Sequence, residues 1–129
     1  MIGIDWDEHA VAAARQDAGE NEMYIAADVE AELGARLRSL PSASREENNA
    51  LIVDPPATGL SKMILQTLIE RQPTQLIYVS CNPATLARDL AALKESFRID
   101  SITPLDMFPQ TAEIECVAHL QTEMGRNRE

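Results

Sequence analysis

Apolar runs alternate with helical patterns from one end of the chain to the other. Short apolar runs are typical of strands, whereas segments with apolar positions three or four residues apart are typical of helices. This alternation predicts an α/β fold with a mostly parallel sheet built from strand–helix units. Strands are predicted over residues 2–5, 23–27, 51–54, 76–80, 97–102 and 114–120, and helices over residues 7–19, 29–39, 61–71 and 84–94.

Two proline positions help to set the element boundaries. Pro55 and Pro56 force a loop directly after Asp54, because proline lacks a backbone donor and restricts the residue before it. Asn82 and Pro83 have the pattern of an N-cap followed by a proline at the first helical position. Both turns therefore follow a predicted strand at once.

The connections near the C-terminus differ from those of a parallel sheet. Residues 104–111 join the last two predicted strands and are too few for a helical crossover, so these strands are expected to form an antiparallel pair. The polar, Ser-rich segment 40–49 is predicted to be a surface connection, and the polar tail 121–129 to be frayed.

The composition fits one intracellular domain. With 129 residues and 45% hydrophobic content, the chain has material for one core. No apolar stretch approaches the roughly 18 residues of a membrane span, and the N-terminus lacks a secretory signal, so a soluble, cytoplasmic protein is expected. The two cysteines lack CxxC spacing and the two histidines are far apart, which predicts neither a disulfide framework nor a metal site. A net charge of −10 opposes independent nucleic-acid binding.

Three acidic residues stand at predicted strand ends, where open parallel sheets bind their ligands. Asp5 could accept hydrogen bonds from the two ribose hydroxyls of a nucleoside cofactor, or it caps the following helix. Asp28 has the position of an ordinary N-cap. Asp54 could reach a ligand from the proline turn, although an Asp that only stabilises the turn has the same pattern.

Cysteine, glutamate and histidine offer further candidates. Cys81 precedes a capped helix, whose unpaired N–H groups and positive dipole end favour a thiolate, but taken alone its pattern fits inert packing better. Cys116 is predicted to pack. Glu113 and Glu115 are predicted on the opposite face of its strand, as a solvated edge or with one as a proton acceptor. The histidines are predicted outside catalysis, His9 on a helix surface and His119 at a strand end.

Three segments resemble, in order and spacing, the signature segments of the RNA 5-methyluridine (uracil-C5) methyltransferase family. They are LIVDPPATG at 51–59, IYVSCNPATLARD at 77–89 and LDMFPQTAEIECV at 105–117. Residues 2–28 resemble the family's cofactor-binding strand–helix–strand, so the resemblance covers nearly the whole chain. It implies a Rossmann-like, S-adenosylmethionine-dependent methyltransferase fold whose mostly parallel sheet ends in an antiparallel pair.

The resemblance also implies roles for five residues. Cys81 corresponds to the nucleophile that adds to C6 of the target uracil, and Glu115 to the acceptor of the C5 proton. Asp5 corresponds to a contact with the cofactor ribose, Asp28 to one near the adenine, and Asp54 to one near the methionine end and the target base. Addition at C6 activates C5, and the base must leave its stack to be reached. Residues 54–59 contain no cysteine, which favours uracil over cytosine.

The chain departs from the family pattern at two positions. The family usually has arginine where this chain has Ala57, and histidine where it has Glu113. Both differences make the site more negative, which disfavours a thiolate and weakens phosphate binding. They suggest, as an alternative, a non-catalytic RNA-binding or scaffolding descendant. A methyltransferase for a small molecule or protein is a further alternative, but it leaves SCNPATLARD unexplained.

The family fold usually begins with a strand and a glycine-rich loop, and an RNA-binding barrel usually precedes it. This chain starts at the counterpart of the second strand, so we expect residues 1–129 to be part of a catalytic domain, with a cofactor side at 1–28, catalytic motifs at 51–120 and a tail at 121–129. The whole protein is expected to act on uridine in tRNA or rRNA, its basic surface lying elsewhere. The isolated 129 residues are expected to bind S-adenosylmethionine weakly, to methylate nothing detectable, and to self-associate through exposed sheet edges.

Overall fold

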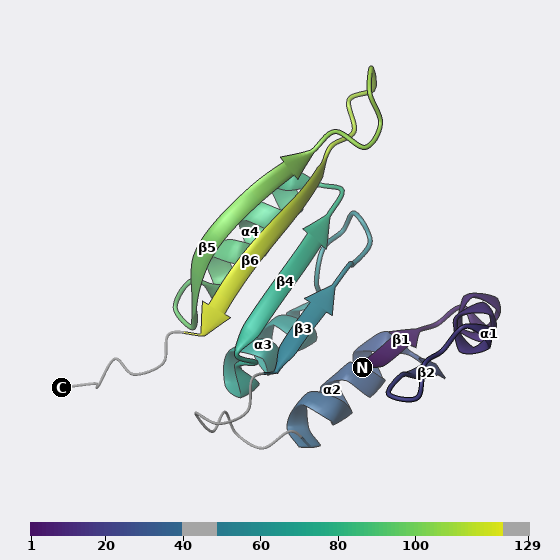
Figure 1. The fold of residues 1–129 in the computed structure, drawn as a ribbon. Coiled ribbons are helices and arrows are strands. Elements are labelled where there is room, and N and C mark those ends of the chain that lie inside the picture. The colour runs from purple at the N-terminus through teal and green to yellow at the C-terminus, as the bar shows by residue number, and fades with distance from the viewer. Residues whose placement is uncertain (40–48, 123–129) are drawn as a thin grey trace. The chain divides into compact units, whose positions relative to one another are not determined.

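The computed structural model describes residues 1–39 and 49–122 (Figure 1). By its internal contacts the chain divides into two compact units, one over residues 1–39 and one over residues 40–129. Among the described residues, each unit contains its own sheet. Residues 40–48 of the predicted surface connection and residues 123–129 of the predicted tail lie outside the described residues.

The first unit contains a parallel pair of strands. Its elements are β1 (Ile2–Asp5), α1 (Glu8–Gln16), β2 (Met23–Ala26) and α2 (Val29–Ser39). In the β1–β2 ladder, Asp5 lies opposite Ala26, so both strands end at the same edge. Arg15 of α1 donates two hydrogen bonds to the Tyr24 carbonyl of β2, at 2.9 and 2.7 Å. The buried apolar side chains of this unit are Val11, Leu33 and Leu37.

Helix α1 is shorter than predicted. Asp7 is its N-cap and accepts hydrogen bonds from the backbone N–H groups of His9 and Ala10, which explains the start at Glu8. The helix ends at Gln16 and not at Gly19. Gly19 instead belongs to the turn before β2, where its carbonyl accepts the Glu22 N–H at 3.1 Å.

The second unit contains a mixed sheet. Among the described residues, the sheet has the order β3 (Ala50–Val53), β4 (Gln75–Ser80), β6 (Glu115–Thr122) and β5 (Phe97–Leu105). β3 pairs in parallel with β4, whereas β6 is antiparallel to both β4 and β5. The predicted antiparallel pair is therefore confirmed. The register also places β6 between β4 and β5, which the sequence did not indicate.

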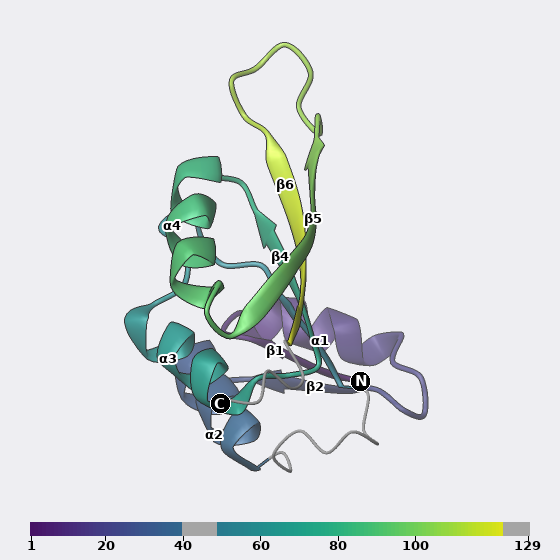
Figure 2. The same cartoon turned by 90° about the vertical axis from the view of Figure 1, so that its left-hand side faces the viewer.

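Helices cover one face of this sheet. Figures 1 and 2 show α3 (Lys62–Arg71) and α4 (Pro83–Leu93) on the same side. Residues alternate between buried and half-buried along β4 and β6, as expected for a sheet with one covered face. The core between helices and sheet includes the side chains of Leu68, Leu76, Tyr78, Leu93, Phe97, Ala118 and Leu120, each at most 1% exposed.

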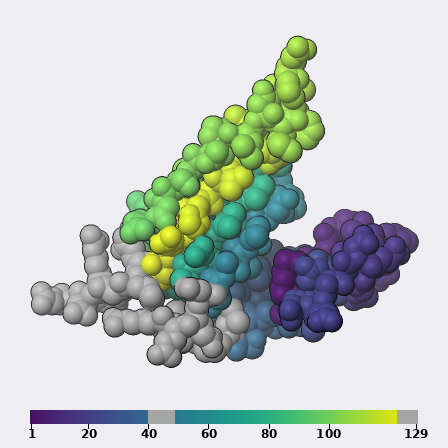
Figure 3. Space-filling model, in the orientation of Figure 1, coloured from purple at the N-terminus to yellow at the C-terminus, as the bar shows by residue number. Residues whose placement is uncertain are grey.

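The almost wholly apolar segment 51–54 has the pattern of a strand covered on both faces, but among the described residues β3 is not covered in this way. Ile52 is 65% exposed, whereas Val53 is buried. Figure 3 shows the sheet face opposite α3 and α4, with β5, β6, β4 and β3 side by side at the surface.

The last hairpin differs from its prediction in three respects. β5 runs to Leu105 and includes Pro104, which is possible because β5 has no partner on its outer side among the described strands. β6 continues to Thr122, so residues 121 and 122 belong to the sheet and not to a frayed tail. β6 begins at Glu115, so Glu113 lies outside the strand, and the predicted shared face of the two glutamates is wrong.

Candidate active site

Two candidate residues stand at the carboxyl ends of the parallel strands β3 and β4. Asp54 follows the last residue of β3, and Cys81 follows the last residue of β4. Val53 lies opposite Tyr78 in this ladder, so Asp54 and Cys81 lie at the same edge of the sheet. Both residues are exposed. This edge is where open parallel sheets bind their ligands.

Glu115 reaches the same edge from an antiparallel strand. The β4–β6 ladder ends with Ser80 opposite Cys116, and one further step of that register sets Cys81 level with Glu115. Glu115 is half-buried and lies opposite Leu105 of β5 on its other side. A thiol and a carboxylate therefore each follow directly beyond the last pair of this ladder.

The turn that carries Cys81 is held by its neighbours. The Ser80 hydroxyl accepts the Asn82 N–H and donates to the Asn82 carbonyl, both at 3.1 Å. Asn82 is the N-cap of α4 and accepts the N–H groups of Ala84 and Thr85 at 3.0 and 3.3 Å, as predicted. Cys81 is nevertheless exposed, so the packing alternative is wrong for it.

Cys116 shows the opposite behaviour. Its side chain is buried, 6% exposed, on the same face of β6 as Ala118, as predicted. The two cysteines thus differ in accessibility, because Cys81 is exposed to solvent and Cys116 is buried.

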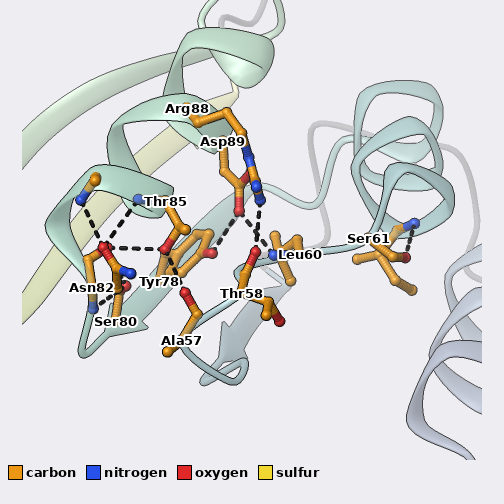
Figure 4. A network of polar contacts seen from close by, with 12 residues as sticks. Ala57, Thr58, Leu60, Ser61, Tyr78, Ser80, Asn82, Thr85, Arg88 and Asp89 are labelled. Carbon is orange, nitrogen blue, oxygen red and sulfur yellow. Dashed lines mark hydrogen bonds and ion pairs between the residues drawn. The ribbon is translucent and has the colours of Figure 1, made fainter.

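The loop after β3 is fastened to α4 by a buried carboxylate (Figure 4). The Asp89 side chain of α4 has no exposed surface. Its Oδ2 atom accepts the Leu60 N–H at 2.8 Å and the Tyr78 hydroxyl at 2.7 Å. Its Oδ1 atom accepts from the Arg88 guanidinium at 2.8–2.9 Å. Burial, and then the bond to Asp89, raise the pKa of Tyr78 above its ordinary value, so the phenol remains a donor.

Two further side chains of α4 bind the same loop. Thr85 donates to the Ala57 carbonyl at 3.0 Å, and Arg88 donates to the Thr58 carbonyl at 2.9 Å. Gly59 has φ +78°, and a Cβ there would lie 2.5 Å from Asp89 Oδ2. Glycine is therefore required by both backbone and space.

This network was not predicted, although the sequence of α4 contains a signal of it. Leu86, Leu90 and Leu93 form the buried stripe of α4, and Asp89 lies within that stripe. An acidic residue on an apolar helix face needs hydrogen-bond partners from elsewhere in the fold.

The residues that depart from the family pattern are both at the surface. Ala57 is exposed in the loop after β3, where its carbonyl and not its side chain makes the contact with Thr85. Glu113 is exposed in the β5–β6 connection, and its N–H donates to the Thr111 hydroxyl at 3.2 Å.

The candidates of the first unit are exposed at the carboxyl ends of β1 and β2. Asp5 Oδ1 accepts the Asp7 N–H at 2.8 Å. The helix cap is Asp7, so the alternative that Asp5 caps α1 is wrong. Asp28 Oδ1 accepts the Ala31 N–H at 2.8 Å and thus caps α2, as its local pattern indicated.

Neither histidine lies at one of the strand ends or turns that carry these candidates. His9 is exposed on α1, as predicted. His119 lies within β6 and not at its end, with Nδ1 3.9 Å from Asp100 Oδ2. Among the described residues, no group of three or more His, Cys, Asp or Glu side chains could hold a metal ion. None of the helices in the same described ranges is long and apolar enough to cross a membrane.

Comparison with known proteins gives a consistent result. Residues 18–123 match the family model described as tRNA (Uracil-5-)-methyltransferase. An uncharacterized RNA methyltransferase of Lactobacillus johnsonii is 42% identical over 93% of this chain, and one of Listeria monocytogenes is 40% identical over 92%. In both cases the match covers 26% of the relative, so the chain spans about a quarter of the length of these relatives.

Solved structures show the fold. The tRNA (uracil-54, C5)-methyltransferase of Pyrococcus abyssi, in complex with S-adenosyl-L-homocysteine, has a TM-score of 0.71 and 35% identity, covering 92% of this chain and 28% of that one. The N-methyltransferase NodS of Bradyrhizobium japonicum has a TM-score of 0.63 at 16% identity, covering 95% and 66%. The predicted Rossmann-like fold of S-adenosylmethionine-dependent methyltransferases is thus confirmed. Given the match over residues 18–123 and these identities, the chain belongs to the tRNA (uracil-5-)-methyltransferase family.

Proposed function

We propose that this chain is the catalytic part of an enzyme that methylates C5 of a uridine in tRNA or rRNA, with S-adenosylmethionine as methyl donor. The observation that carries the proposal is the edge of the second unit, where the register sets Cys81 level with Glu115 and Asp54 follows the neighbouring strand. The names of the family and of the solved Pyrococcus enzyme support the choice of uracil C5.

Cys81 is proposed as the nucleophile. Its sulfur forms a bond to C6 of the uracil, and the electrons of the C5–C6 double bond move toward the ring carbonyl, so that C5 becomes nucleophilic. The exposed thiol at the start of a capped helix supports this role, because helix N-termini stabilise anions. The uracil must leave its base stack to reach this position.

Glu115 is proposed as the proton acceptor. After C5 has gained a methyl group, the Glu115 carboxylate takes the C5 proton. The released electron pair re-forms the C5–C6 double bond and breaks the bond from sulfur to C6, which returns Cys81 as a thiolate. A half-buried carboxylate beside the covalent bond suits this step, because proton transfer needs contact or near contact.

Three carboxylates are proposed to hold the cofactor. Asp5 and Asp28 are exposed acceptors at the carboxyl ends of neighbouring parallel strands, which fits the ribose hydroxyls and the adenine amino group. Asp54 would contact the methionine end and the target base. When bound, S-adenosylmethionine would supply the methyl group that C5 accepts, and would leave as S-adenosyl-L-homocysteine once the bond from its methyl carbon to sulfur is broken.

The whole protein is the unit to test, because the chain spans about a quarter of its relatives and carries a net charge of −10. Phosphate binding needs clustered Lys and Arg, which we expect in other parts of the whole protein. The 129 residues alone are expected to bind the cofactor weakly and to give no detectable turnover. A cytoplasmic location is proposed because the chain belongs to a family of RNA methyltransferases.

RNA that contains 5-fluorouridine tests the proposal, because fluorine at C5 cannot leave as a proton and the covalent adduct persists. The whole protein should form an adduct that requires S-adenosylmethionine and disappears in Cys81→Ser. Ala57 and Glu113 favour a second candidate, a non-catalytic RNA-binding descendant, since both remove positive charge expected near the site. RNA binding without any adduct would support that candidate.

A further inference from the structure

We propose that Asp89 is a positioning residue that locks the loop after β3 to helix α4 and thereby sets Asp54 relative to Cys81. The proposal rests on the function proposed above, because it concerns the geometry of that site. It adds a residue that lies outside the reacting groups and acts through the backbone of the loop.

One carboxylate joins three elements of the second unit. Tyr78 belongs to β4, Leu60 to the loop between β3 and α3, and Asp89 to α4, and all three meet at Oδ2. Removing a buried carboxylate from water is costly unless donors surround it. Asp89 has the Leu60 N–H, the Tyr78 hydroxyl and the Arg88 guanidinium around it. The contact therefore restrains the loop after β3 against β4 and α4, from which it is separated along the chain by helix α3.

The loop is held by its backbone. The carbonyls of Ala57 and Thr58 and the N–H of Leu60 are each bound by a side chain of α4, and Gly59 makes the left-handed turn between them. Figure 4 shows these bonds arranged side by side along one flank of the helix. The course of the loop is consequently independent of the exposed side chains at positions 57 and 58.

The same helix carries the turn of Cys81. Asn82, which directly follows Cys81, caps α4, and the Thr85 hydroxyl lies 3.1 Å from the Asn82 carbonyl and 3.0 Å from the Ala57 carbonyl. Helix α4 thus holds one end of the site through Asn82 and the other through Asp89, Arg88 and Thr85. A loop released from α4 would displace Asp54 while the Cys81 turn remained in place.

Because different residues of the second unit hold the loop and the Cys81 turn, Asp89→Asn should have a specific effect in the whole protein. An amide keeps one oxygen for Leu60 and Tyr78 but turns an N–H₂ group toward Arg88, which weakens the clamp. Amide hydrogen exchange at Leu60 should rise at least about tenfold, since opening would cost less. Alkylation of Cys81 by iodoacetamide should stay within about twofold of wild type. Adduct formation on 5-fluorouridine RNA should slow by about a hundredfold, the effect of an ångström-scale misplacement.

Arg88→Gln is the second variant, because the Arg88 side chain is 56% exposed and its loss should leave the fold intact. It removes the contact to Thr58 and is expected to show the same pattern as Asp89→Asn, at about tenfold in adduct formation. Lys94→Gln removes a positive charge from the end of the same helix and serves as the matched control. It should match wild type in all three measurements.

The outcomes test separately whether Asp89 clamps the loop and whether the loop positions the site. Wild-type exchange at Leu60 in both Asp89→Asn and Arg88→Gln would overturn the clamp. So would wild-type adduct formation despite faster exchange, because the loop would then not position the site. If Cys81 alkylation changed as much as adduct formation, the residues would act on the thiol and not on the loop. A wild-type protein that forms no adduct would refute the proposed function, and Asp89 would then have no positioning role in it.

Discussion

Cys81 and Glu115 flank the last pair of the β4–β6 ladder, because Ser80 lies opposite Cys116 and each of the two residues is the next one beyond that pair. They belong to different sequence motifs, separated by a helix and a strand. The insertion of β6 between β4 and β5 is what brings them to one edge.

The two cysteines should respond in opposite ways to substitution by serine. Cys81→Ser should change the free energy of unfolding by no more than about 0.5 kcal/mol, because the side chain is exposed. Cys116→Ser should lower it by about 1–3 kcal/mol, because it buries a hydroxyl group. Urea denaturation measures both. Only Cys81→Ser should lose the adduct, and loss in Cys116→Ser while the protein remains folded would contradict the assignment.

Glu115→Gln should trap the reaction on ordinary uridine RNA. An amide cannot accept the C5 proton, so the methylated, Cys81-linked RNA should accumulate and be retained on a denaturing gel. Glu113→Gln is the matched control, because Glu113 is exposed outside β6, and it should release its product normally. Rapid release by Glu115→Gln would exclude Glu115 as the proton acceptor.

Tyr78→Phe should cost about 1.5–3 kcal/mol of unfolding free energy at pH 8, the usual contribution of a hydrogen bond to a charged group. The difference from wild type should shrink as the pH rises above 10. The raised pKa means that the folded protein holds the phenol proton more tightly than the unfolded chain, whose ordinary pKa is 10.0. Stabilisation is therefore complete below pH 10 and is lost above it.

Tyr24 is present in both proteins, so its own titration cancels in that comparison. A difference that stays constant, or that grows, between pH 9 and pH 11 would show that the Tyr78 phenol is not held in this way. Denaturation by urea at fixed pH values is the measurement.

Ala57→Arg should be tolerated by the fold and should tighten RNA binding by the whole protein. The side chain at position 57 is exposed, and the loop is held through its carbonyl. One added phosphate contact should steepen the dependence of binding on salt by about 0.7–0.9 in the log–log slope. Binding titrations at several salt concentrations measure it. Ala57→Gln is the uncharged control, and an equal slope for both variants would contradict the prediction.

Much of the fold was predictable from local pattern. The strands and helices alternate as expected, and Asn82 with Pro83 marks the start of α4, because caps and proline act within a few residues. The end of β5 was not predictable, since Pro104 is allowed only by an outer position in the sheet, which depends on strand order. The exposure of Ile52 likewise depends on what covers a face.

The residues of the candidate site were more predictable than the contacts that hold them in place. Asp54 and Cys81 follow strands, which a local pattern reveals, whereas the position of Glu115 at the same end of the ladder as Cys81 depends on a register between distant segments. The clamp formed by Asp89, Tyr78 and Leu60 joins three elements and has only one local trace, an acid on an apolar helix stripe.

The most direct test of the central claim maps the covalent bond. The whole protein is incubated with S-adenosylmethionine and 5-fluorouridine RNA, digested with protease and nuclease, and analysed by tandem mass spectrometry. The account predicts a methylated fluorouridine attached to the peptide that contains Cys81, with none on Cys116. Attachment at another residue, or no attached nucleotide in a folded protein that binds the RNA, would contradict it.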